Sequence, residues 1–177
     1  KTPSGLLIKN EREHNLYKLT TQEIKRYDVG SLPSKAFPNQ INTRLSKPSF
    51  KDLAKLMSKF PSVRLNIEVK SEEKYYDIFQ PSPKAYTRIL VEEVHQLKCQ
   101  FMVQSFDASI LNELYNLRPD ISLGLLINGE LDPSLDLRLL KFLPNYYNPA
   151  VDFLTREALN YLKSNNIKVI PWTVNDL

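Results

Sequence analysis

From Ser49 onward, short apolar runs alternate with helix-like segments, and this alternation restricts the fold more than any other feature. Apolar side chains at every second position predict a strand over residues 63–69, and further strand-like runs cover 101–104, 121–127, 146–147 and 167–171. Capping residues and one-sided apolar patterns predict helices at 49–58, 82–97, 107–119, 132–142 and 155–164. Strands separated by helical crossovers predict a parallel sheet in an α/β protein.

This pattern alone fits both a TIM barrel and a doubly wound sheet. The chain has only four glycines, and no predicted strand is followed by a GxGxxG sequence, which argues against a dinucleotide site. The first 48 residues are different, because they are rich in proline and glycine breaks and hold one short predicted helix near residues 21–27. We therefore divide the chain into an irregular region, 1–48, and an α/β domain, 49–177.

Charge and composition exclude several broad classes of protein. The net charge is +4, and the basic residues of the N-terminal region are interleaved with acidic ones. A nucleic-acid-binding surface usually has clustered and less compensated charge. No apolar stretch approaches the roughly 18 residues of a membrane-spanning helix, so we expect no stable membrane insertion. Cys99 is the only cysteine, so no internal disulfide can form, and it does not decide the compartment.

The ends of the predicted strands carry the residues with chemical potential, because active residues of parallel α/β proteins lie at the carboxyl ends of strands. Glu68 and Lys70 are two residues apart and share one strand face. A carboxylate beside an ammonium suits a hard cation together with a phosphate, although a solvated edge strand would show the same alternation. Asp107 is most simply a helix N-cap, and Trp172 fits either packing or a substrate platform.

Three of these strand ends together resemble a known family. NIEVK at 66–70, QSFD at 104–107 and PWTVND at 171–176 are similar, in the same order, to the signature of the glycerophosphodiester phosphodiesterases, which are PLC-like TIM-barrel enzymes. YDVG at 27–30 and FPNQ at 37–40 are also similar to that family. The resemblance covers nearly the whole chain. It implies a TIM (β/α)8 barrel of which this chain supplies roughly strands 3 to 7, with 1–48 as an insertion after strand 2.

The resemblance also implies an activity and a set of site residues. The family hydrolyses glycerophosphodiesters to an alcohol and sn-glycerol 3-phosphate with a divalent cation, Ca²⁺ or Mg²⁺. Glu68 corresponds to a metal ligand and Lys70 to the lysine that contacts the phosphate. Phe106 and Trp172 correspond to residues that line the substrate pocket. Further positions within the motifs have less definite roles, and they are Ser105, Thr173 and Asn175.

The sequence departs from the family in its acid–base residues. The family's two catalytic histidines, in an HRG motif and an HD pair, and the ExD metal motif of its second strand are not found here. Nothing around His14 or His95 matches these motifs, so we assign no catalytic residue within the chain. We therefore expect a segment of a longer polypeptide, without the N- and C-terminal barrel elements, with no complete metal site and no activity by itself.

Other functions fit parts of the same pattern. A non-catalytic barrel relative that binds a ligand would keep the fold without the histidines. A phospholipase-D-like lipid phosphodiesterase would share the barrel and the metal, and a mildly basic lipid- or nucleic-acid-binding module would show salt-sensitive binding. The insertion resembles that of bacterial family members, many of which are exported, so we expect a periplasmic or secreted enzyme of lipid and glycerol metabolism rather than a cytoplasmic one.

Overall fold

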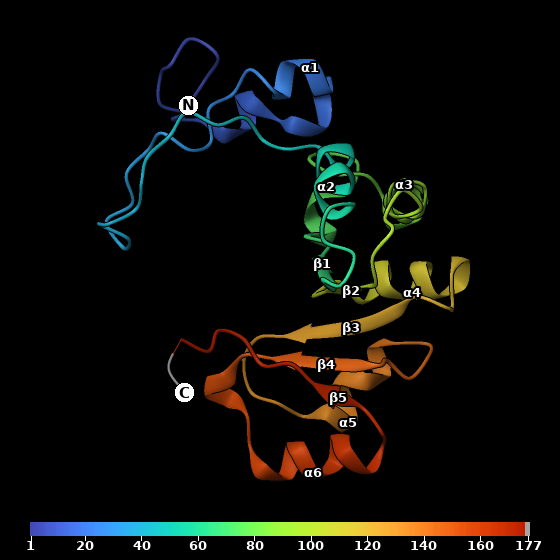
Figure 1. Cartoon of the computed structure of the whole chain (residues 1–177). Helices are drawn as coiled ribbons and strands as arrows, with labels where there is room; N and C mark the ends of the chain where they lie inside the picture. Colours follow the sequence, from blue (N-terminus) through green and yellow to red (C-terminus); the bar gives the residue numbers. More distant parts are fainter. Residues whose placement is uncertain (176–177) are drawn as a thin grey trace. The chain divides into compact units, whose positions relative to one another are not determined.

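The computed structural model describes residues 1–175 and divides the chain into two compact units, Lys1–Leu56 and Met57–Leu177. Figure 1 shows the irregular N-terminal unit in blue and the sheet unit in green to red. The division falls within helix α2 (Phe50–Met57), somewhat beyond the end of the irregular region 1–48. The assignment of 1–48 as an insertion after a second barrel strand, and of 49–177 as one domain, stays a prediction.

Short helical segments form most of the regular structure of the first unit. They are η1 (Glu11–His14), η2 (Leu16–Lys18) and α1 (Thr21–Ile24). A reciprocal capping box starts α1, because the Thr20 hydroxyl accepts the Glu23 N–H while the Glu23 carboxylate accepts the Thr20 N–H. The helix ends at Ile24, so the predicted helix over 21–27 is shorter than expected.

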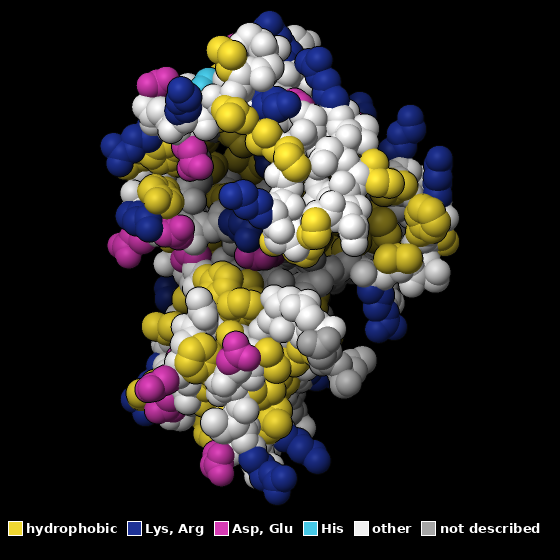
Figure 2. Space-filling model, turned by 90° about the vertical axis from the view of Figure 1, so that its left-hand side faces the viewer, with side chains coloured by type: hydrophobic (Ala, Val, Ile, Leu, Met, Phe, Trp, Pro, Cys, Tyr) yellow, Lys and Arg dark blue, Asp and Glu magenta, His cyan; other side chains and the backbone are white. Residues whose placement is uncertain are grey.

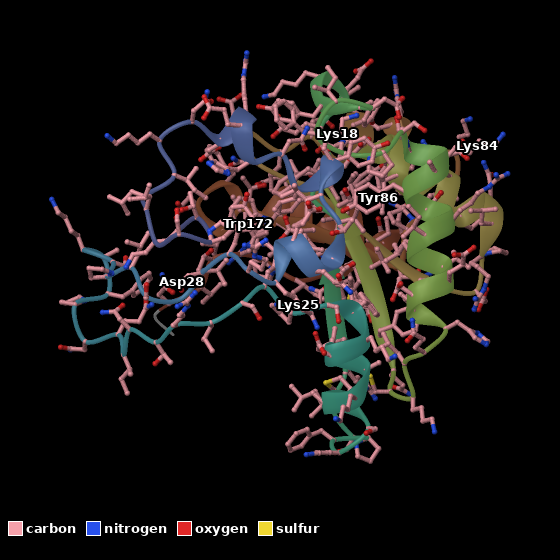
Figure 3. The ribbon with its side chains drawn as sticks, turned by 90° about the horizontal axis from the view of Figure 1, so that it is seen from above. Lys18, Lys25, Asp28, Lys84, Tyr86 and Trp172 are labelled. Carbon is pink, nitrogen blue, oxygen red and sulfur yellow. The ribbon has the colours of Figure 1, made fainter. Side chains whose placement is uncertain are left out.

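Asp28 organises the YDVG segment of the first unit and is labelled in Figure 3. Its carboxylate accepts hydrogen bonds from the N–H groups of Gly30 (3.0 Å) and Ser31 (3.1 Å) and from the Ser31 hydroxyl. The Ser31 hydroxyl above all, together with these N–H groups, holds the pKa of Asp28 well below its usual value. A side chain at Gly30 would begin 2.3 Å from the Thr43 carbonyl oxygen, so only glycine fits this close approach.

The second unit is built on one sheet of five parallel strands (Figure 1). The strands are β1 (Leu65–Glu68), β2 (Phe101–Ser105), β3 (Ser122–Ile127), β4 (Tyr146–Pro149) and β5 (Lys168–Val169). Their spatial order is the order of the sequence, β1-β2-β3-β4-β5. A doubly wound sheet reverses its order at a switch point, whereas a barrel does not. The predicted α/β fold is confirmed, and the sequential order is that of an arc of a TIM barrel.

Helices cover one face of this sheet. They are α3 (Pro83–Val94), α4 (Ala108–Leu117) and α6 (Arg156–Ser164), and α4 contacts both β2 and β3. Fully buried side chains fill the layer around α4, with roughly 1.5–3 kcal/mol of transfer free energy for each. They are Val103, Ile110, Leu111, Leu114, Leu123 and Leu125. The opposite face of β1 and β2 carries the polar side chains of Asn66, Glu68 and Gln104 together with Met102.

In the second unit, two predicted elements differ clearly from the structure. The helix expected over 132–142 stops early, as α5 (Pro133–Asp136) followed by η4 (Leu137–Leu139). The Asn112 side chain of α4 donates to the Leu139 carbonyl and accepts the Lys141 N–H, so backbone groups that would continue the helix are held by a neighbouring helix. The last strand is also shorter than expected. Within residues 1–175, no helix is long and apolar enough to cross a membrane.

Candidate active site

Glu68 and Lys70 lie at the carboxyl end of β1, on the face away from the helices. The Lys70 Nζ is 3.0 Å from Glu68 Oε1. The Lys70 side chain is 84% exposed and the Glu68 side chain 29% exposed. An ion pair this accessible adds little to stability, so both groups remain available to a ligand. The structure therefore brings together the two residues that the sequence singled out on this strand.

Ser105 joins the ends of β1 and β2. Its buried hydroxyl donates to the Val69 carbonyl oxygen at 2.7 Å and accepts the Asp107 N–H at 3.0 Å. Because the only hydroxyl proton is already used, Ser105 acts here as a link between neighbouring strands. Its contribution to a ligand site stays a prediction.

Asp107 connects three segments at this edge of the sheet. Its Oδ1 accepts the Ser109 N–H at 2.9 Å and thereby caps α4, as the sequence predicts. Its Oδ2 accepts the hydroxyls of Ser71 at 2.6 Å and Tyr76 at 2.5 Å. Burial, and then the hydrogen bond to this carboxylate, raise the pKa of Tyr76 to about 12. Asp107 thus holds the loop that directly follows Lys70.

Phe106 and Trp172 form an aromatic pair beside these groups. Their ring centroids are 5.7 Å apart with an interplanar angle of 86°, an edge-to-face contact. The Trp172 indole N–H donates to the Asn148 carbonyl oxygen at 3.0 Å, and the Trp172 backbone N–H donates to Pro149 at 2.9 Å. The Phe106 side chain remains 45% exposed. Trp172 is labelled in Figure 3, and Figure 2 shows hydrophobic side chains exposed on the side of the sheet unit at which the strands end.

The remaining residues of the last motif follow Trp172. Thr173 and Asn175 are exposed, and Asp176 lies outside the described residues. The role of Asn175 stays a prediction.

Sequence reasoning missed a row of three amide side chains across the sheet, which we call the amide clamp and define as Asn66, Gln104 and Asn148. Gln104 Oε1 accepts hydrogen bonds from Asn66 Nδ2 at 3.0 Å and from Asn148 Nδ2 at 2.5 Å. The signal was present, since Gln104 stands two residues before Phe106 and so shares its strand face. The partners could not be identified because they depend on strand register.

A comparison with family models settles the family. Residues 10–177 match the model of the glycerophosphoryl diester phosphodiesterase family. The chain belongs to this family. No sequence among functionally curated proteins matches the chain.

Solved structures of several phosphodiesterases resemble the chain in fold. A Silicibacter pomeroyi protein is 20% identical with a TM-score of 0.83, covering 99% of this chain and 64% of its own. An Oleispira antarctica phosphodiesterase in complex with the product sn-glycerol-3-phosphate is 21% identical with a TM-score of 0.68, covering 90% and 60%. A glycerophosphodiester phosphodiesterase from Parabacteroides distasonis is 22% identical with a TM-score of 0.61, covering 89% and 59%. The chain thus spans less than two thirds of these proteins, and identities this low establish the fold alone.

The family uses a divalent cation. Within residues 1–175, no group of three or more His, Cys, Asp or Glu side chains is close enough to bind a metal. Glu68 supplies one carboxylate, and its charged neighbour is the Lys70 ammonium. Because Ca²⁺ takes six to eight oxygens and Mg²⁺ takes six, these residues alone do not fit a complete site for either ion.

The two histidines belong to different units of the chain. In the first unit, His14 Nδ1 is 2.9 Å from the Tyr27 hydroxyl. In the second unit, His95 is the C-cap of α3, and the chain from there enters the amino end of β2. Neither histidine is identified as a catalytic residue of a glycerophosphodiester phosphodiesterase.

Proposed function

We propose that this protein is a metal-dependent glycerophosphodiester phosphodiesterase that hydrolyses its substrate to an alcohol and sn-glycerol 3-phosphate. One observation carries the proposal. A carboxylate–lysine pair, Glu68 and Lys70, and an aromatic pair, Phe106 and Trp172, stand at the carboxyl ends of strands of one parallel sheet. Active sites of barrel enzymes lie at this edge. The family match and the Oleispira complex with sn-glycerol-3-phosphate support the choice of substrate.

Each site residue has a proposed role that follows from its chemistry. Lys70, with an exposed ammonium, neutralises a phosphoryl oxygen of the anionic diester and the charge that grows there in the transition state. Phe106 and Trp172 present apolar ring surface to the carbon part of the substrate. Glu68 is one ligand of the divalent cation, Ca²⁺ or Mg²⁺, and Asn175 is a further polar contact.

Within residues 1–175 no group of three or more His, Cys, Asp or Glu side chains could hold a metal, so Glu68 would be one ligand among several. The proposed reaction therefore needs further metal ligands and proton-transfer groups besides those that the described residues bring to Glu68. Residues 1–175 by themselves are expected to bind phosphate without hydrolysing the diester.

We also propose that the protein is bacterial and is periplasmic or secreted. The resemblance of residues 27–40 to exported relatives supports this location, and cell fractionation tests it.

The deciding experiment follows sn-glycerol 3-phosphate release from glycerophosphocholine with and without EDTA. Release that EDTA abolishes supports a metal-dependent phosphodiesterase. Binding of sn-glycerol 3-phosphate without any release, measured on the complete polypeptide, would point instead to a non-catalytic relative and contradict the proposal.

A matched pair of lysine variants tests the site. Lys70→Ala should lower turnover by roughly 100-fold or more, the usual loss for one group that stabilises transition-state charge. Lys74→Ala serves as the control, because Lys74 lies on the same loop and pairs with Glu72 at 2.5 Å in an exposed ion pair. We expect Lys74→Ala to change turnover by less than about twofold. Equal losses of turnover in both variants would show that Lys70 has no specific role in the proposed site.

A further inference from the structure

The amide clamp leaves one end of the Gln104 side chain free. The Gln104 carbonyl oxygen already accepts two hydrogen bonds, from Asn66 on one side and Asn148 on the other. A carboxamide oxygen has two lone pairs, so its capacity is filled. The Nε2 of Gln104 has no hydrogen-bond partner among the residues that the structure describes. Two N–H donors therefore point away from the clamp in a fixed direction.

The strand order and register of the sheet determine which side chains form the amide clamp. Asn148 lies on β4 and Gln104 on β2, with β3 between them. The two side chains meet over Gly124, which is the register partner of Gln104. A side chain at Gly124 would begin 2.8 Å from Asn148 Nδ2, so any other residue would obstruct the contact.

The orientation of Asn148 leaves one of its polar atoms without a hydrogen bond. Asn148 is 1% exposed, and its Oδ1 is buried without a partner among the described residues. A buried unsatisfied acceptor is destabilising, and exceptions to good packing concentrate at functional sites. The main-chain oxygen of the same residue accepts the Trp172 indole N–H. Asn148 thus orients Gln104 through its side chain and Trp172 through its backbone.

Gln104 is also placed where a ligand would bind. Glu68 and Gln104 are register partners on β1 and β2, so their side chains stand side by side on the face away from the helices. Phe106 follows two residues later on the same face. Gln104 is only partly buried, so a ligand can reach it.

We propose that Gln104 is a substrate-binding residue, whose Nε2 donates to a phosphate oxygen of a glycerophosphodiester or of sn-glycerol 3-phosphate while Asn66 and Asn148 hold its amide in place. This inference rests on the proposed function for the identity of the organic part, but the phosphate contact itself does not. The clamp fixes the donor before the ligand arrives, so no side-chain ordering remains to be done on binding.

The test compares two replacements of Gln104. Gln104→Glu keeps the oxygen that Asn66 and Asn148 need and replaces the free NH₂ by oxygen, whereas Gln104→Met removes the whole amide. Gln100→Glu is the charge-matched control, because Gln100 is exposed and directly precedes the amino end of β2. The readout is the quenching of Trp172 or, if the complete polypeptide contains further tryptophans, calorimetry. The probes are sn-glycerol 3-phosphate and inorganic phosphate, both in EDTA, which excludes effects on metal binding.

We expect both Gln104 variants to weaken binding of the two probes by roughly 10- to 100-fold, the range for one hydrogen bond to a charged group. Gln100→Glu should stay within about twofold. Gln104→Glu retains the clamp oxygen but adds a carboxylate beside Glu68, so its melting temperature should fall slightly. A Gln104→Glu variant that folds and binds both probes like the wild type would overturn the inference.

The variant Asn148→Leu tests the role of the amide clamp independently. It removes the buried unsatisfied oxygen and releases the Gln104 amide, so binding should fall while the melting temperature does not. A lower melting temperature with unchanged binding would show a purely structural clamp and overturn the inference. If the wild type binds phosphate but releases no sn-glycerol 3-phosphate from glycerophosphocholine, the proposed function is wrong. The assignment of Gln104 is then decided by the binding data alone.

Discussion

Replacing Asp107 by alanine should destabilise the sheet unit and loosen the loop that carries Lys70. The Asp107 carboxylate accepts the Ser109 N–H, the Ser71 hydroxyl and the Tyr76 hydroxyl, at 2.9, 2.6 and 2.5 Å. Loss of the helix cap costs about 1 kcal/mol. The two hydroxyl contacts to an ionised acceptor add about 1 kcal/mol each, taken at the low end because the site is partly exposed. The sum is about 3 kcal/mol, an upper figure because neighbouring contacts are not additive.

The measurement is thermal unfolding followed by circular dichroism. For a chain of this size, 3 kcal/mol corresponds to a decrease in Tm of roughly 6–12 °C. Asp107→Asn is the matched control, since asparagine caps helices as well as aspartate does and keeps one acceptor oxygen. Its NH₂ group cannot accept the Ser71 and Tyr76 hydroxyls, so it should cost about 2 kcal/mol. An Asp107→Asn variant as stable as the wild type would show that the contacts to Ser71 and Tyr76 contribute nothing.

Four further predictions follow from individual side chains. Because the pKa of Tyr76 is raised, its neutral hydroxyl stabilises the fold below pH 10, and this stabilisation should be lost between pH 10 and about 12. The stability difference between the wild type and Tyr76→Phe, measured by alkaline unfolding, tests this. Because the pKa of Asp28 is lowered, its carboxylate stabilises the fold above pH 3.8, and this stabilisation should decrease as the pH falls below that value. Acid unfolding of the wild type should show this decrease, and acid unfolding of Asp28→Asn should not. Gly124→Ala should cost about 1–3 kcal/mol in urea unfolding, because its methyl group would meet Asn148. Tyr147→Phe should cost about 1–2 kcal/mol and remove the tyrosine that burial and Asp136 hold above its usual pKa, which ultraviolet titration detects.

The order of the elements in the sheet unit follows directly from the sequence, because it depends on local patterns. Asp107 and Thr155 both cap helices as their positions indicate, and the alternation in 66–70 correctly places Glu68 and Lys70 on one face. Local pattern overestimated the helix after Asp132. Its end is set by Asn112, a residue on another helix.

The parts of the site that the sequence did not reveal are contacts over long sequence distances. Ser71 and Asp107 are 36 residues apart, and Gln104 and Asn148 are 44 apart. Such pairs are fixed by the register of neighbouring strands, which a single sequence does not define. The family motifs indicated which strand ends matter, but the hydrogen-bond partners of Gln104 and Trp172 became apparent only in the sheet.

The most direct test of the proposed site is a crystal structure of the protein with sn-glycerol 3-phosphate bound. A phosphate oxygen should lie within about 3 Å of Lys70 Nζ, with the glycerol carbons against Phe106 and Trp172. The sheet unit also has a hollow at the amino ends of its strands, lined in part by Arg64 and Arg118. A phosphate bound there, with Lys70 and Trp172 free of ligand, would contradict the account.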